Sequence, residues 1–83
     1  MENYKTSDLW LAGYLIARGN ALIDVDRSNP RRTAFILAHP PTAEEQRGFD
    51  SGDGLAPIGA LMGAIRKLKR CLYDGMPGGG RYD

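Results

Sequence analysis

The 83-residue sequence has a single cysteine, Cys71, and a single histidine, His39. One cysteine excludes an internal disulfide and a zinc site built from several thiolates of one chain, and it fits a reducing cytosol. His39 precedes two prolines, and no nearby residue suggests the partner that nucleophilic catalysis requires. We therefore expect His39 to be a loop residue and Cys71 to be a small, buried core thiol.

The sequence also has no large excess of charge of one sign, since it contains 11 lysines and arginines and 10 acidic residues. Net charge therefore selects neither a nucleic acid nor a membrane as partner. No apolar run approaches the roughly 18 residues of a membrane span, and the opening Met-Glu-Asn-Tyr-Lys lacks the basic region of a signal peptide. We expect a cytoplasmic protein with no membrane partner.

Sequence motifs for catalysis or ion binding are absent as well. There is no P-loop and no dinucleotide fingerprint, and the glycines at 78–80 follow no predicted strand. Asp24 and Asp26 would point to one face of a strand, but no third acid follows at a suitable spacing, so a solvated strand face is favoured. Residues 50–54 lack the register of a calcium loop. We expect no enzyme, no cofactor and no metal.

The first predicted element is a helix over residues 7–18. Thr6 or Ser7 can serve as its N-cap, and Asp8 would then lie in the first turn, where the helix dipole favours a negative charge. Its core stripe at helical spacing comprises Leu9, Ala12, Gly13 and Ile16.

Residues 21–27 alternate between apolar and polar side chains, as a half-buried strand does, and residues 31–38 are predicted to form the returning strand. The intervening Ser28-Asn29-Pro30 is typical of a turn, so the two segments predict a β-hairpin. Because two strands alone are marginal in water, the hairpin needs a helix against one face. The side chains predicted to face inward are Ile23, Val25, Phe35 and Leu37.

Residues 39–54 are predicted to be a loop or a short helix. Thr42 and Glu45 match a capping box, and Gly48 is expected to end any helix that starts there. A second long helix is predicted from Pro57 to about Tyr73, ended by Gly75. Its apolar stripe comprises Leu61, Ala64, Ile65, Leu68 and Leu72.

These elements predict the fold class. The order α-β-β-(short α)-α indicates a small α+β domain in which two helices pack on a β-hairpin. We place this single domain at residues 1–75 and expect residues 76–83 to form a flexible, glycine-rich tail.

Trp10 and Tyr14 lie one turn apart on the first helix, outside its core stripe. Large aromatic side chains usually enter the core of their own chain, so the long loop is the first candidate to cover them. The alternative is a partner molecule that binds there.

The second long helix carries a basic face opposite its apolar stripe. Its outer row comprises Gly59, Gly63, Arg66 and Arg70, flanked by Lys67 and Lys69, with Arg31 and Arg32 of the hairpin as an extension if they lie nearby. Phosphates or an acidic protein surface would suit this face, and the alternative is a solvated surface. Two glycines on an outer helix face argue for a close neighbour.

The first helix, Thr6-Ser7-Asp8-Leu9-Trp10-Leu11-Ala12-Gly13, resembles the start of a short presumed domain of bacteria and phages that has no established function. The resemblance extends over roughly residues 4–73, through the basic residues of the hairpin to Leu68-Lys69. This chain departs from the pattern at Gly13, in the acidic loop at 44–53 and in its tail. The resemblance implies a small prokaryotic or phage protein with a non-enzymatic role.

We therefore predict a non-catalytic protein-binding module, in particular a phage or mobile-element inhibitor that sterically blocks a host defence complex, as anti-CRISPR proteins do. Its partner would be a host protein or a ribonucleoprotein complex. The first alternative is an accessory protein that binds nucleic acid through the basic face of the last helix. The second is a homodimer joined at Gly59 and Gly63 or at Trp10. The predicted binding residues are Trp10, Tyr14, Arg31, Arg32, Gly59, Gly63, Arg66, Lys67, Lys69 and Arg70.

Overall fold

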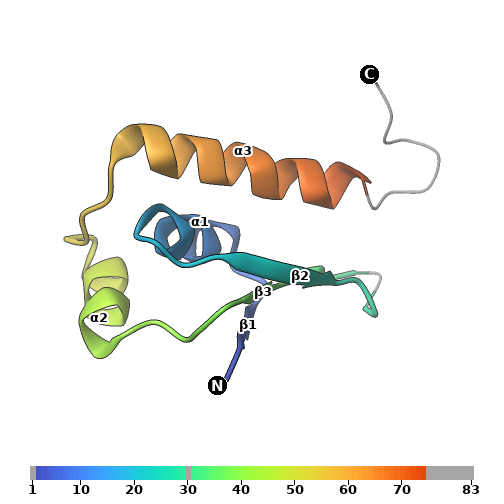
Figure 1. The fold of residues 1–83 in the computed structure, drawn as a ribbon, viewed down its shortest axis with the longest axis horizontal. Coiled ribbons are helices and arrows are strands. Elements are labelled where there is room, and N and C mark those ends of the chain that lie inside the picture. Colours follow the sequence, from blue (N-terminus) through green and yellow to red (C-terminus); the bar gives the residue numbers. More distant parts are fainter. Residues whose placement is uncertain (1, 30, 75–83) are drawn as a thin grey trace.

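The residues that the structure describes form three short strands and three helices (Figure 1). The computed structural model describes residues 2–29 and 31–74, so the predicted tail at 76–83 and the helix end at Gly75 lie outside the described residues. The elements are β1 (Tyr4–Thr6), α1 (Leu9–Ala17), β2 (Leu22–Asp26), β3 (Ala34–Leu37), α2 (Ala43–Ser51) and α3 (Ile58–Asp74). This arrangement confirms the predicted α+β class.

The three strands form one antiparallel sheet in the order β1-β3-β2. The β2–β3 hairpin was predicted, and β1 is an addition that pairs Thr6 with Phe35 and Tyr4 with Leu37. Phe35 and Leu37 face inward as predicted and are almost fully buried. The third strand gives the sheet more paired backbone groups than a hairpin alone would have.

A β-bulge corrects the predicted orientation of Ile23. Leu22 pairs with Leu37 and Asp24 with Ile36, so Ile23 is the extra residue on β2. Such a residue shifts the alternation of side chains by one position. As a result Leu22 packs against the core together with the predicted Val25, whereas the side chain of Ile23 is 55% exposed.

Helix α1 is the central element of the fold, which explains why it lacks a polar side. Five consecutive residues of this helix, Leu11–Leu15, are buried. They lie between α3, α2 and the inner face of the sheet. Asp8 is the N-cap, in place of the predicted Thr6 or Ser7: its carboxylate accepts hydrogen bonds from the N–H groups of Trp10 (3.0 Å) and Leu11 (3.1 Å). A carboxylate there satisfies two otherwise unpaired donors and also suits the helix dipole.

Helix α3 lies across α1, and its predicted apolar stripe is confirmed. Ala64, Ile65 and Leu68 are buried, while Leu61 and Leu72 pack at the edge of the core. The contact with α1 is close at Gly13, where an added Cβ would lie 2.3 Å from Cδ1 of Ile65. Gly13 therefore lets the two helices approach each other.

Helix α2 begins as predicted and ends later than predicted. The Thr42 hydroxyl accepts from the N–H of Glu45, and the Glu45 carboxylate accepts from the N–H of Thr42, both at 3.0 Å, which completes the capping box. The helix continues past Gly48 to Ser51 and ends at Gly52, whose φ of +84° is the left-handed conformation that glycine favours. Gly48 serves a different purpose, because an added Cβ would lie 3.0 Å from the Cα of Gly54.

Candidate partner-binding surface

The two aromatic residues of α1 that the sequence leaves unassigned lie in different surroundings. Tyr14 is 8% exposed and belongs to the core, where its ring lies 5.8 Å from that of Phe49. Trp10, one turn earlier, is 57% exposed. Helix α2 and the segment after it cover Tyr14, so it lies in the core and not on the predicted binding surface. They leave Trp10 accessible, which corrects the expectation that the loop covers both aromatic residues.

Trp10 stands at the edge of an open, largely apolar hollow with a volume of about 230 Å³. We call it the Trp10 hollow; α1, α2, the segment after α2 and α3 contribute its lining residues Trp10, Tyr14, Gly48, Phe49, Gly52, Gly54 and Leu61. The glycines leave room for the Tyr14 ring, since a Cβ at Gly54 would lie 2.3 Å from the tyrosine oxygen. The hollow is thus open space bordered by aromatic and aliphatic side chains.

The apolar surface extends from the hollow along the first turns of α3. Ile58 lies one turn before both Leu61 and Met62, and the side chains of Ile58 and Met62 are 73% and 54% exposed. Two exposed acids, Asp50 and Asp53, lie two residues before and one residue after Gly52, which lines the hollow. The surface therefore combines an apolar centre with negative charge on one edge, as protein interfaces often combine an apolar core with a polar rim.

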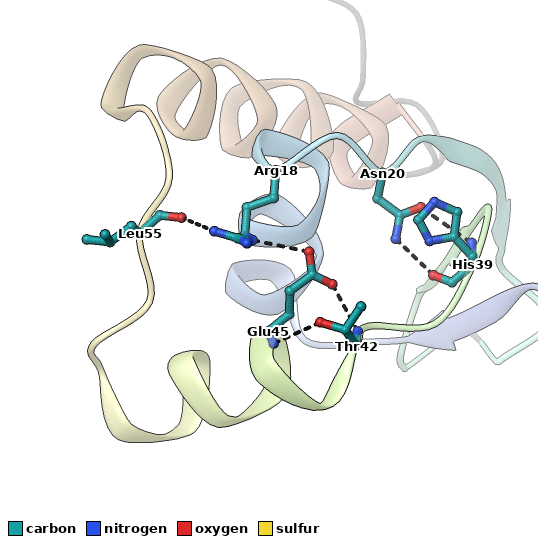
Figure 2. Close-up of polar contacts among 6 residues, drawn as sticks. All are labelled: Arg18, Asn20, His39, Thr42, Glu45 and Leu55. Carbon is teal, nitrogen blue, oxygen red and sulfur yellow. Dashed lines mark hydrogen bonds and ion pairs between the residues drawn. The ribbon is translucent and has the colours of Figure 1, made fainter.

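Arg18 holds the segments around the hollow together (Figure 2). At the C-cap of α1, its Nε donates to the Glu45 carboxylate at 3.1 Å and its Nη1 donates to the carbonyl oxygen of Leu55 at 2.6 Å. Its guanidinium carbon lies 5.6 Å from the centre of the Tyr14 ring. One side chain thus links α1, α2 and the connection to α3, and no sequence pattern pointed to this role.

The same contacts determine the ionisation of Glu45. The N–H of Thr42 donates to its carboxylate and Arg18 binds it from the other side, so the pKa of Glu45 lies below its ordinary value despite partial burial. The charged form is therefore favoured in the folded protein.

Asn20 binds the backbone of the connection between β3 and α2. Its side chain is buried, and its Nδ2 donates to the carbonyl oxygen of His39 at 2.8 Å (Figure 2). His39 lies between β3 and α2 with an exposed side chain, as predicted for a loop residue. Its backbone contributes to the fold, because its carbonyl oxygen accepts from Asn20 and its N–H donates to the Asn20 side-chain oxygen.

The predicted outer face of α3 is exposed along its whole row. A Cβ added at Gly59 or Gly63 would meet nothing within 4 Å, so the space beside both glycines is open. Arg66 and Arg70 are exposed on the same face. Neither of the two ion pairs found among the described residues involves a cation of α3; these pairs are Lys5–Asp26 and Arg18–Glu45.

The hairpin reaches this end of α3 through an arginine that the sequence analysis did not single out. Nη2 of Arg27 donates to the carbonyl oxygen of Cys71 at 2.5 Å. Arg31 and Arg32 are exposed in the connection that follows. Cys71 itself is half-buried, which corrects the expectation of a buried thiol, because it lies on the flank of α3 rather than in the stripe.

The outer face of the sheet carries the pair Asp24 and Asp26. Asp26 is bound by the Lys5 ammonium at 2.8 Å and by the N–H of Ser28 at 2.9 Å, and both contacts lower its pKa. Within the described ranges 2–29 and 31–74, no three His, Cys, Asp or Glu side chains lie close enough together to hold a metal ion. Asp26 is thus engaged in a surface ion pair, whereas the exposed Asp24 carboxylate accepts a hydrogen bond from the N–H of Val25.

Among the residues that the structure describes, none of the helices combines the length and apolar character needed to cross a bilayer. No protein-family model, curated protein or solved structure matches this chain.

Proposed function

We propose that this protein is a non-catalytic protein-binding module that contacts its partner through the Trp10 hollow. The observation that carries the proposal is the exposure of Trp10 beside an apolar hollow that the rest of the fold leaves open. Tryptophan is enriched among the residues that contribute most to binding energy, and such residues lie where an apolar centre can be fully desolvated.

The chemistry around the hollow defines the kind of surface that fits it. An apolar side chain of the partner would enter between Trp10 and Leu61, and a neighbouring lysine or arginine would face Asp50 and Asp53. The partner is therefore a protein that presents an apolar anchor beside a cation.

Photocrosslinking tests this proposal even when the partner is unidentified. Trp10→benzoylphenylalanine, produced in a bacterial host, should give a discrete crosslinked product of one host protein. The matched control is Ile23→benzoylphenylalanine, because Ile23 is exposed to almost the same extent, 55% against 57%, but lies on β2. Equal crosslinking at both positions would contradict the proposal, and a product of twice the chain's mass would show that the hollow binds a second copy.

The narrower form of the proposal is an inhibitor that sterically blocks a host defence complex. Steric obstruction requires only a binding surface and bulk, and a small domain with an accessible apolar anchor provides both. Expression of the protein should raise the plating efficiency of a phage that the defence complex targets. Trp10→Ala should lower it again and Ile23→Ala should not; no rise in plating would contradict the inhibitor role.

A further inference from the structure

Seven of the chain's 11 lysines and arginines lie in two segments that are far apart in the sequence. All seven are exposed. We call them together the cationic end; they are Arg27, Arg31 and Arg32 after β2, and Arg66, Lys67, Lys69 and Arg70 in the second half of α3.

The fold brings these two segments into contact. Arg27 donates to the carbonyl oxygen of Cys71, the residue directly after Arg70. The connection between β2 and β3 does not extend far from the end of the sheet. Asp26 pairs with Ala34, and the N–H of Arg32 donates to the carbonyl oxygen of Asn29 at 3.1 Å. Figure 1 shows this connection and the C-terminal half of α3 at the same end of the molecule, with α2 at the opposite end.

Asp24 on β2 and Asp74 at the end of α3 belong to the elements that meet here, but most of the other acidic residues lie elsewhere or are already bound. Glu44, Glu45, Asp50 and Asp53 belong to α2 and the segment after it. Asp26, next to Arg27 in the chain, is held by Lys5. The net charge of +1 therefore conceals a separation of charge along the molecule, and local fields rather than net charge steer binding.

The composition of the cationic end favours a nucleic acid over a protein. Protein interfaces depend on an apolar centre. Among the side chains that the structure describes, however, the exposed large apolar ones lie near the Trp10 hollow, apart from Ile23 at the opposite end of β2 from the connection. Five of the seven cations are arginines, whose planar guanidinium groups match phosphate oxygens in pairs.

We infer that the cationic end binds the phosphate backbone of nucleic acid, with cations from the hairpin connection and from α3 contacting the same strand or duplex. Contacts to phosphates carry no information about base sequence, so binding is independent of sequence and weakens steeply with salt. This surface is separate from the Trp10 hollow, and either one can function without the other.

Fluorescence anisotropy with a labelled DNA or RNA of random sequence tests the inference. The wild-type protein should bind at about 50 mM salt, and log K should fall linearly with log[salt]. Arg66→Glu/Arg70→Glu and Arg31→Glu/Arg32→Glu should each weaken binding by ~10-fold or more and lower the salt slope by ~2. Circular dichroism verifies that each variant is folded.

The matched control is Arg47→Glu, which reverses an exposed cation on α2, outside the cationic end. It should leave the affinity within about 2-fold of wild type, since surface changes away from a binding site have small effects. The inference would be overturned if the wild-type protein did not bind at low salt. It would also be overturned if the two double variants lost no more affinity than Arg47→Glu does. Competition by polyglutamate as strong as that by unlabelled DNA would assign the surface to an acidic protein instead. Trp10→Ala should not change nucleic-acid binding, so this inference and the proposed function can fail separately.

Discussion

Glycines in this chain occupy two opposite kinds of surroundings. Gly54 lies against Tyr14, where an added Cβ would meet the oxygen at 2.3 Å and the ring carbon Cζ at 2.7 Å. Gly63 lies on the open face of α3, where an added Cβ would meet nothing within 4 Å. The same substitution should therefore have opposite effects at the two positions.

Gly54→Ala should lower the free energy of unfolding by ~1–3 kcal/mol, because the added methyl group displaces a buried aromatic ring. Gly63→Ala should raise it by up to ~1 kcal/mol, because alanine has the higher helix propensity. Urea titrations of both variants measure these changes. A Gly54→Ala variant as stable as wild type would contradict the close contact of the Tyr14 ring with Gly54.

Several residues could be placed from the sequence because their signals are local. Phe35, Leu37 and the stripe of α3 follow simple periodicities, and the capping box of Thr42 and Glu45 is a short motif. Ile23 could not be placed, since the bulge that turns it outward depends on its pairing with β3. Gly48 does not end α2 as predicted; it lies against Gly54 and Tyr14, which are tertiary neighbours that no sequence spacing reveals.

Among the elements, α2 depends most on its own capping, because none of its side chains is fully buried. Removal of the Thr42 hydroxyl leaves the N–H of Glu45 without its acceptor. Thr42→Ala should therefore lower the free energy of unfolding by ~1 kcal/mol. Hydrogen exchange should accelerate in α2 more than in α3, and uniform acceleration would show that α2 is not an independently stabilised cover of Tyr14.

The stability of α2 should also depend on pH through Glu45. Its pKa is lower in the folded chain than in the unfolded chain, so ionised Glu45 contributes stability above the unfolded value, and this contribution is lost as the pH falls through the lowered folded value. Glu45→Gln should therefore differ most from wild type near neutral pH, and the difference should shrink in acid.

Urea midpoints measured across the acidic range test this dependence. The control Glu44→Gln removes the same charge from the same turn but keeps the bonds of Glu45 to Thr42 and Arg18. A difference between wild type and Glu45→Gln that stays constant with pH would contradict the role assigned to these contacts.

In the whole molecule, an apolar surface and a cationic surface occupy different places. The Trp10 hollow lies where α1, α2 and the start of α3 meet, and the cationic end lies at the hairpin connection and the second half of α3. The basic row of α3 was predicted, whereas its junction with the hairpin through Arg27 could be found only in the folded chain. The two proposals together describe a partner that contains both protein and nucleic acid.

The affinity of two matched variants for the crosslinked host protein tests most directly whether the Trp10 hollow is the binding surface. Trp10→Ala should weaken binding by ~30-fold or more, as removal of a central aromatic anchor costs about 2 kcal/mol or more. Ile23→Ala removes an equally exposed side chain from β2 and should leave the affinity within about 2-fold. Equal affinities of the two variants, measured by calorimetry, would contradict the account.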